Sequence, residues 1–157
     1  MQRMTRLAML ATVVATVWGG VVSADTFSPR QYYSDWRRPA QGNYYVRNYY
    51  CKPNPQYAGY RVHEVRYFPA KPDHYYYFNP RTKKYWGRCP SHCEGKPLYS
   101  LLEPDDRHAD LAKIPESAFP PPGKLPAIPE SDPQEGASLD LPPEDAPPIG
   151  AGPSPAP

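Results

Sequence analysis

The chain has three cysteines, Cys51, Cys89 and Cys93, which are its side chains best able to form a covalent cross-link. In an oxidising compartment two thiols usually form a disulfide. A bond from Cys51 to Cys89, or instead to Cys93, would close a loop of about 40 residues and stabilise the fold by roughly 3–4 kcal/mol. A bond between Cys89 and Cys93 would close only a local turn. We therefore expect a bridge from Cys51, with the third thiol reduced or joined to another chain.

Two of these cysteines also belong to a motif with metal-binding side chains. The run CPSHC places His92 between Cys89 and Cys93, and His63 or His74 would have to supply a fourth ligand. Zinc sites usually take their ligands from two separated pairs, and the chain has no second cysteine pair. Oxidation outside the cytosol competes with metal binding for the same thiols. We expect neither a metal nor another cofactor.

Known catalytic motifs do not occur in the sequence. It contains no serine in a Gly-x-Ser-x-Gly turn, no glycine-rich phosphate loop and no His-Glu-x-x-His pair. The acids Glu64, Asp73 and Glu94 are scattered without a pairing. Few large aliphatic side chains are available in this region to enclose a water-free pocket. We expect a protein that is not an enzyme.

Aromatic side chains gather in the run HYYYFNPRTKKYWGRCPSHC, which begins at His74. Residues 79–82, Asn-Pro-Arg-Thr, have the composition of a type I turn, because asparagine caps the first position and proline presets φ at the second. A hairpin around this turn that pairs Phe78 with Lys83 also opposes Tyr75 and Trp86. One face then carries Tyr76, Phe78 and Tyr85, and the other carries Tyr75, Tyr77 and Trp86.

A hairpin with rings on both sides needs a second layer, which the following helix, a second molecule or a ligand would supply. Basic residues lie among the rings, and such a mixture suits a glycan or a polyanion. The candidate binding face therefore consists of Tyr75, Tyr77, Trp86, Lys84 and Arg88. Interleaved rings and cations also suit single-stranded nucleic acid. We do not expect that partner, because the start of the chain predicts export.

The elements that must position these residues are short strands. Residues 43–51, 59–68, 74–78 and 83–89 have strand composition, and turn-forming residues separate them. Between Asn43 and Pro90 the large aliphatics are limited to three valines at positions 46, 62 and 65, so a core here would be built from rings. The expected fold is small and all-β, an antiparallel hairpin or meander of three to four strands over residues 43–99.

One short helix is expected in the linker over residues 100–114. Pro104 suits a first helical position, and Lys113 suits the C-terminal end of the helix dipole, so the helix would cover residues 103–113. From residue 115 to 157, fourteen of 43 residues are proline. Such a segment buries too little apolar surface to offset its ordering entropy. We expect a disordered, acidic, proline-rich tail.

Charge divides the chain into a basic body and an acidic tail. Residues 30–96 hold thirteen basic and four acidic side chains, whereas residues 115–157 hold one basic and seven acidic. The body can therefore attract its own tail or an outside polyanion. The tail also contains a repeat, because the sequence Ile-Pro-Glu-Ser occurs at 114–117 and again at 128–131. Residues 126–129 match the PxxP pattern of ligands for aromatic grooves.

The first residues predict an export signal over 1–24. Arg3 and Arg6 precede an apolar run, and Val-Ser-Ala at 22–24 suits a cleavage site. The run is shorter than the roughly 20 residues of a spanning helix, so we expect no transmembrane span after cleavage. A flexible segment over 25–42 would lead into the body. The mature protein would lie in the periplasm, the cell envelope or outside the cell.

Two resemblances add to these expectations. Tyr-Tyr-Phe-Asn at 76–79, Thr82, Trp86 and Pro90 are similar to the second and third strands of the WW domain, which binds proline-rich peptides. The spacing from Thr82 to Trp86 is one residue short of that pattern, and Trp36 is too far upstream to be its first tryptophan. Residues 85–90 (YWGRCP), 99–102 (YSLL) and 114–121 (IPESAFPP) resemble a family of small secreted proteins of planctomycete bacteria. This second resemblance implies export and assigns no activity, and Cys93 departs from its pattern.

Two functions agree with the sequence. The first is a structural or interaction protein of the envelope or exterior, whose tyrosine-rich sheets associate with each other or with an envelope polymer. The second is a monomeric binding module that uses an aromatic and basic sheet face for a glycan or polyanion. The first predicts association that persists at high salt, and the second predicts ligand binding that weakens as salt rises.

Overall fold

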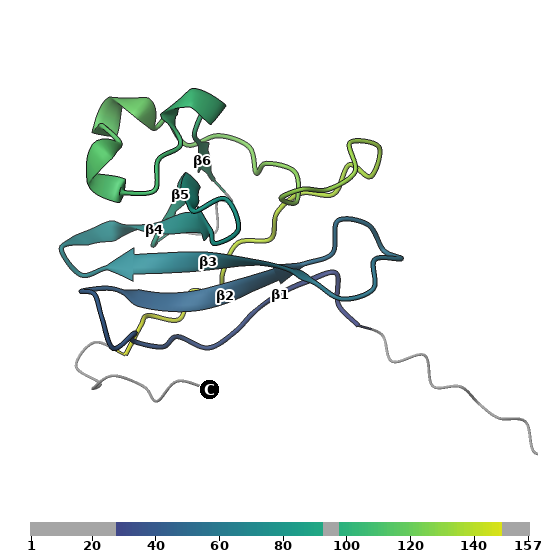
Figure 1. Ribbon diagram of the computed structural model, residues 1–157, viewed down its shortest axis with the longest axis horizontal. Coiled ribbons are helices and arrows are strands. Elements are labelled where there is room, and N and C mark those ends of the chain that lie inside the picture. The colour runs from purple at the N-terminus through teal and green to yellow at the C-terminus, as the bar shows by residue number, and fades with distance from the viewer. Residues whose placement is uncertain (1–27, 93–97, 149–157) are drawn as a thin grey trace, which may run out of the picture.

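A computed structural model describes residues 28–92 and 98–148 of the chain. At its centre is one antiparallel sheet whose strands follow each other in chain order (Figure 1). The strands are β1 (Gln31–Tyr33), β2 (Tyr45–Cys51), β3 (Arg61–Phe68), β4 (Lys71–Asn79), β5 (Lys84–Pro90) and β6 (Ser100–Leu101). The predicted antiparallel meander is confirmed, but the described residues form six strands and not three to four. The predicted signal segment, 1–24, lies outside the described residues.

The two strands that sequence analysis missed, β1 and β6, are the shortest. β1 lies within residues 25–42, which we expected to be flexible, and it pairs along its whole length with the end of β2. Arg37 forms a further bridge with Val46. β6 pairs with β5 through Leu101 and Gly87. Strands of two or three residues are too short to show an alternating pattern, so their partner strands decide their conformation.

The helix predicted over residues 103–113 is wrong. The segment forms the 3-10 turns η1 (Pro104–Asp106) and η2 (Leu111–Lys113), and η3 (Glu116–Ala118) follows. Between the first two turns, the carbonyl of His108 accepts a 2.9 Å hydrogen bond from the N–H of Tyr85. Asp110 then starts a new turn, because its side chain accepts a hydrogen bond from the N–H of Ala112. A helix this short is marginal in water, so these two contacts are enough to divide it.

The turn of the β4–β5 hairpin is capped as predicted, but the pairing around it differs. The side-chain oxygen of Asn79 accepts hydrogen bonds from the backbone N–H groups two and three residues later, at 2.9 and 3.3 Å. Lys83 has a φ of 54° and belongs to the turn, so Asn79 pairs with Lys84 and Phe78 with Tyr85. The predicted register is therefore wrong by two residues. An even shift leaves side chains on their predicted faces.

A bulge interrupts this hairpin. The register shifts between Tyr77 and Phe78, and Tyr77 pairs with Gly87, which leaves Trp86 as the additional residue of β5. A bulge reverses the alternation of side chains beyond it. Trp86 therefore shares a face with Tyr77, whereas Arg88 lies on the opposite face.

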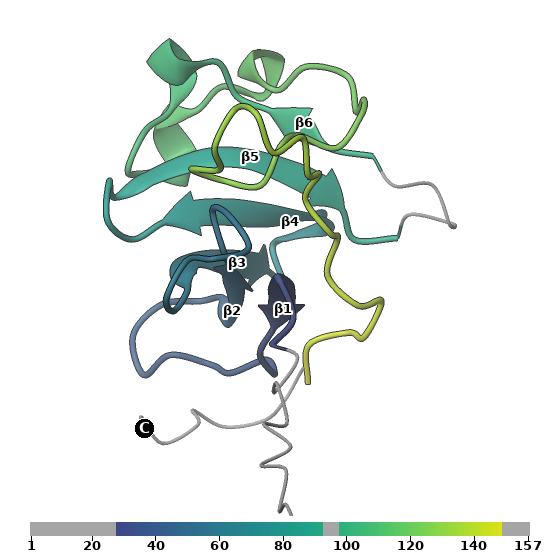
Figure 2. The same cartoon turned by 90° about the vertical axis from the view of Figure 1, so that its right-hand side faces the viewer.

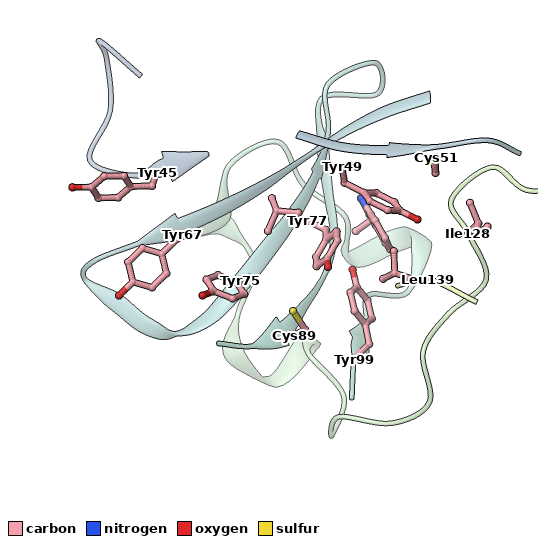
Figure 3. Packing of buried hydrophobic residues seen from close by; sticks show 12 residues of the cluster. Tyr45, Tyr49, Cys51, Tyr67, Tyr75, Tyr77, Cys89, Tyr99, Ile128 and Leu139 are labelled. Atoms are coloured by element: carbon pink, nitrogen blue, oxygen red, sulfur yellow. The ribbon is translucent and has the colours of Figure 1, made fainter. Parts of the chain in front are cut away.

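Each face of the sheet carries a hydrophobic cluster, and we name the faces after two neighbouring residues of β4. The cluster on the Tyr77 face consists mainly of rings, as the scarcity of aliphatic residues predicted (Figure 3). It contains Tyr45, Tyr49, Cys51, Val65, Tyr67, Tyr75, Tyr77, Trp86, Cys89, Tyr99, Ile128 and Leu139. The cluster on the Tyr76 face contains Tyr76, Phe78, Tyr85, Leu102, Leu111, Ile114 and Phe119. The hairpin rings lie on the faces that the sequence predicted.

The proline-rich segment covers the Tyr77 face. Residues 124–148, which we call the strap, run along this side of the sheet (Figures 1 and 2). Ile128 and Leu139 are 1% and 0% exposed, so the prediction of a disordered tail is wrong for the described part of it. Gln31 of β1 holds the strap backbone, since its amide donates to the carbonyl of Ser138 and accepts from the N–H of Asp140. Proline restricts the unfolded chain, so an extended strap loses less entropy on binding.

Ion pairs also attach the strap. Glu135 lies 3.2 Å from Arg30, and Asp145 lies 2.7 Å from Arg47, whose side chain is 3% exposed. Arg47 also lies over the ring of Trp36, at 4.7 Å from the ring centroid. The basic body thus attracts its own acidic tail, which is one of the two outcomes that the charge pattern allowed.

Candidate functional site

The structure divides the five residues of the predicted binding face. Tyr75, Tyr77 and Trp86 are 4%, 0% and 7% exposed, so the rings are core residues beneath the strap. Burial raises the pKa of Tyr75 to about 12. Arg88 lies on the Tyr76 face, because the bulge reverses the alternation after Trp86. Lys84 is exposed. The five side chains therefore do not form one open face.

Arg88 instead fastens the segment that covers the Tyr76 face. Its guanidinium group lies 4.1 Å from the ring centroid of Phe119 and forms an ion pair with Glu116. This ion pair holds the pKa of Glu116 below its usual value. Arg88 therefore makes contacts within the chain, and its role as a ligand contact stays a prediction.

No disulfide joins Cys51 and Cys89, which are both thiols and both buried. β2 and β5 are separated by two strands, so the two cysteines are three strand spacings apart, about 14 Å, and their positions along the strands also differ (Figure 3). A disulfide needs Cα atoms within about 7 Å. Burial raises the pKa of Cys51 to about 12, which keeps its thiol protonated. Cys93, the alternative partner, lies outside the described residues.

A pocket of about 750 Å³ opens where the hairpin turn meets the strap. Its walls come from β3, the turn of the β4–β5 hairpin, β5, β6, η1 and strap residues 126–131 and 133. Trp86 and Leu101 supply apolar surface, and Leu101 is 39% exposed. Pockets of this size and apolar character are typical of small-molecule sites.

Three cations and one acid stand around this pocket. The cations are Lys84, Arg81 and Arg107, and the acid is Glu130. Arg81 is paired with Glu130, whereas Lys84 and Arg107 form no ion pair within residues 28–92 and 98–148. Arg107 is held at the rim because its Nε donates a 3.1 Å hydrogen bond to the carbonyl of Leu102. The pocket therefore combines an apolar interior with positive charge.

Glu130 is held from three directions. Its Oε1 accepts a 2.6 Å hydrogen bond from Arg81 and a 3.2 Å hydrogen bond from the side-chain amide of Asn79. Its Oε2 lies 3.2 Å from the Nε of Arg61. Asn79, Arg81 and Glu130 also line a second, smaller hollow of about 170 Å³ beside the first. The carboxylate of Glu130 therefore stands between two hollows.

His63 lies in the wall of both hollows and is 2% exposed. Its Nδ1 is buried without a hydrogen-bond partner. The pKa of His63 is lowered to about 4, mainly by burial; Glu130 opposes this shift, and Arg81 contributes to it. The imidazole is therefore neutral at pH 7.

The described residues show neither a metal centre nor a membrane-spanning helix. Within residues 28–92 and 98–148, no group of three or more His, Cys, Asp or Glu side chains gathers as a metal site would require. In the same ranges no helix has the length and apolar character needed to cross a bilayer. The CPSHC motif cannot be placed, because Cys93 lies outside these ranges.

No protein-family model matches the chain, and neither curated proteins nor solved structures give a significant match. The similarities to the WW domain and to secreted planctomycete proteins therefore stay predictions.

Sequence reasoning found part of this pocket and missed the rest. Trp86 and Lys84, two of the five predicted binding residues, line it. Leu101, Arg107 and the strap residues were not proposed. The repeated Ile-Pro-Glu-Ser was the available signal, because both isoleucines are buried and both glutamates pair with arginines.

Proposed function

We propose that this chain is an exported, non-catalytic binding module, and that its pocket takes a small ligand with an apolar body and an acidic group. One observation carries this proposal. The pocket has an apolar interior beside two cations, Lys84 and Arg107, that form no ion pair within the described residues. An apolar group in the interior and an anion at the rim would satisfy both features.

The proposal keeps the binding function expected from the sequence and moves its location. The rings expected to form an open face are covered by the strap, so a long glycan has no continuous row of rings to stack on there. The pocket is also bounded by several segments, which suits a compact ligand better than a polymer. Export remains the prediction of residues 1–24.

A matched pair of probes tests this function. 2-Naphthoate and 2-naphthalenemethanol share one apolar body, and only the first carries a negative charge. We expect 2-naphthoate to bind the mature chain with one-to-one stoichiometry in isothermal titration, and more tightly than the neutral alcohol. The preference should shrink as salt rises, because the rim charges are exposed.

Variants locate the binding. Leu101→Asp should abolish binding of 2-naphthoate, and Lys84→Ala should weaken it. Lys113→Ala is the matched control, because this lysine lies outside the pocket lining and should change nothing. Equal binding of both probes, or equal effects of the two lysine variants, would refute the proposed pocket function.

Self-association is the second candidate function, and a different surface favours it. Tyr32 and Val62 are each 38% exposed, and both neighbour Tyr50 in the register of β1, β2 and β3. Tyr32 stacks on Tyr50 with ring centroids 4.5 Å apart. A second copy of the chain is the occupant this patch would take. Sedimentation of the mature chain at low and high salt tests it, since apolar association persists at high salt and Val62→Asp should abolish it.

A further inference from the structure

The rim cations Lys84 and Arg107 attract the acidic group of a ligand, and where that group finally binds is a further question that rests on the proposed function. The surroundings of Glu130 show where a carboxylate can bind, because the fold already holds the carboxylate of Glu130 at the pocket wall. Two arginines and an asparagine amide surround it, which is the kind of donor set that recognises carboxylates in proteins.

The backbone at Glu130 is unfavourable for a glutamate. Residues 128–131 form a turn closed by a 2.9 Å hydrogen bond from the N–H of Ser131 to the carbonyl of Ile128. Glu130 has a φ of 59° at the third position of this turn, where glycine or asparagine is the usual residue. A glutamate at this position is held by its side-chain contacts, against the preference of its backbone.

The donors around Glu130 are also not fully used. The Nε of Arg61 is buried and lies near Oε2 of Glu130, yet it has no hydrogen-bond partner of acceptable geometry. The neighbouring Nδ1 of His63 is buried and likewise without a partner. Buried polar groups of this kind cost free energy until an acceptor or donor reaches them. Glu130 therefore fits the site incompletely, because its position is fixed by the turn.

We infer that Arg61, Arg81 and Asn79 form a carboxylate-binding subsite between the pocket and the smaller hollow beside it, which Glu130 occupies until the carboxylate of a ligand replaces it. The exchange forms no covalent bond and moves no proton. The Glu130 side chain turns away, and the ligand carboxylate accepts the hydrogen bonds in its place. Because the ligand is not attached to the turn, its carboxylate can align better with the donors. Ile128 and Leu139 keep the strap on the sheet while this happens, because both remain buried.

The first experiment tests the subsite without any assumption about the ligand. Glu130→Gly removes the carboxylate and leaves the residue that the turn favours. We expect sodium acetate to raise the thermal midpoint of this variant above its value in sodium chloride of equal ionic strength. The original chain and Glu135→Gly should show no such difference. Glu135 is the matched control, because it is another strap acid that pairs with an arginine but lies outside both hollows.

The second experiment connects the subsite to the ligand. The affinity of 2-naphthoate should rise about tenfold in Glu130→Gly, because the competing carboxylate has been removed. Glu130→Gly combined with Arg81→Ala should lose both this gain and the acetate effect. Glu130→Gln keeps a side chain of the same size and should give a smaller gain.

The outcomes separate the two proposals. Acetate rescue without a preference for 2-naphthoate over its alcohol would support the subsite and refute the pocket function. Binding of 2-naphthoate to the original chain, with unchanged affinity in Glu130→Gly and no acetate rescue, would support the pocket function and overturn the subsite. Should Glu130→Gly fail to fold, Glu130→Gln provides the same affinity comparison, and an unchanged affinity there overturns the subsite.

Discussion

The two copies of Ile-Pro-Glu-Ser lie on opposite faces of one sheet. In each copy the isoleucine is buried: Ile114 belongs to the cluster on the Tyr76 face, and Ile128 to the cluster on the Tyr77 face. The glutamate of each copy pairs with an arginine from the hairpin, Glu116 with Arg88 and Glu130 with Arg81. The repeat thus fastens a covering segment to each face.

The copies differ in what surrounds the glutamate. Glu116 begins the 3-10 turn η3, and its side chain is 69% exposed beside one arginine. The backbone of Glu130 has a positive φ. Its side chain is 24% exposed and is held by two arginines and an amide at a pocket. The same four residues therefore form a simple fastener on one face and a constrained carboxylate on the other. The environment, and not the motif, decides the difference.

Substitution of Gly87 should have the largest effect on stability, because the clusters on both faces of the sheet depend on the hairpin that contains it. A Cβ at Gly87 would lie 2.3 Å from the hydroxyl of Tyr99 and 2.6 Å from the carbonyl of Ser100. We expect Gly87→Ala to lower the free energy of unfolding by about 3 kcal/mol in urea denaturation, since backbone as well as a ring must move. Gly123→Ala is the control, because its nearest contact is an ordinary 4.0 Å. Equal stabilities of the two variants would contradict this packing.

The two isoleucines test whether both coverings belong to the folded unit. Ile114 and Ile128 are 5% and 1% exposed, so each change to alanine should cost about 2–3 kcal/mol in urea denaturation. Val62→Ala, at a side chain that is 38% exposed, should cost much less. A disordered tail would leave the stability of Ile128→Ala unchanged, and that result would remove the pocket wall as well.

The sequence predicts the sheet better than the strap that covers it, and this difference has a physical reason. The four long strands and the faces of the hairpin rings follow from local alternation and turn chemistry, which the sequence displays. Ordering of the strap follows from contacts between residues far apart in sequence, such as Gln31 with Asp140, which composition does not show. The bulge at Trp86 misplaced Arg88 for a related reason, because one additional residue reverses every later position. The pocket could not be predicted without the ordered strap, which supplies one of its walls.

His63, which lines the same hollows as Glu130 of the second copy, should make the stability of the folded chain depend on pH. Its pKa of about 4 in the folded chain lies below the ordinary 6.5, so the unfolded chain takes up the proton first as pH falls. The stability that His63 contributes is therefore complete above about pH 6.5 and is lost towards pH 4. We expect a loss of about 2 kcal/mol between pH 7 and pH 5 in urea denaturation.

His63→Phe should keep the ring contact with Trp86 and remove this part of the pH dependence. Because Glu130 and Arg81 both act on the imidazole, Glu130→Gln provides a second check. Loss of the favourable carboxylate should lower the pKa of His63 further, so that the loss of stability still begins near pH 6.5 but continues to lower pH and becomes larger. The same pH dependence in the chain with and without His63 would show that another group is responsible.

Substitution of the two glutamates should have the smallest effect on stability, and it compares the two copies of the repeat most directly. Glu116→Gln should change the free energy of unfolding by less than about 0.5 kcal/mol, because its carboxylate is 69% exposed beside a single arginine and is well solvated. Glu130→Gln should cost about 1 kcal/mol, because it removes the ion pairs with Arg61 and Arg81, which have no other ion pair within the described residues, and weakens the hydrogen bond from Arg81. High salt should reduce the Glu116 effect more than the Glu130 effect, since the carboxylate of Glu116 is more exposed to the screening ions than that of Glu130. Equal costs with equal salt dependence would mean that Glu130 is a fastener like Glu116, with no special hold on its carboxylate.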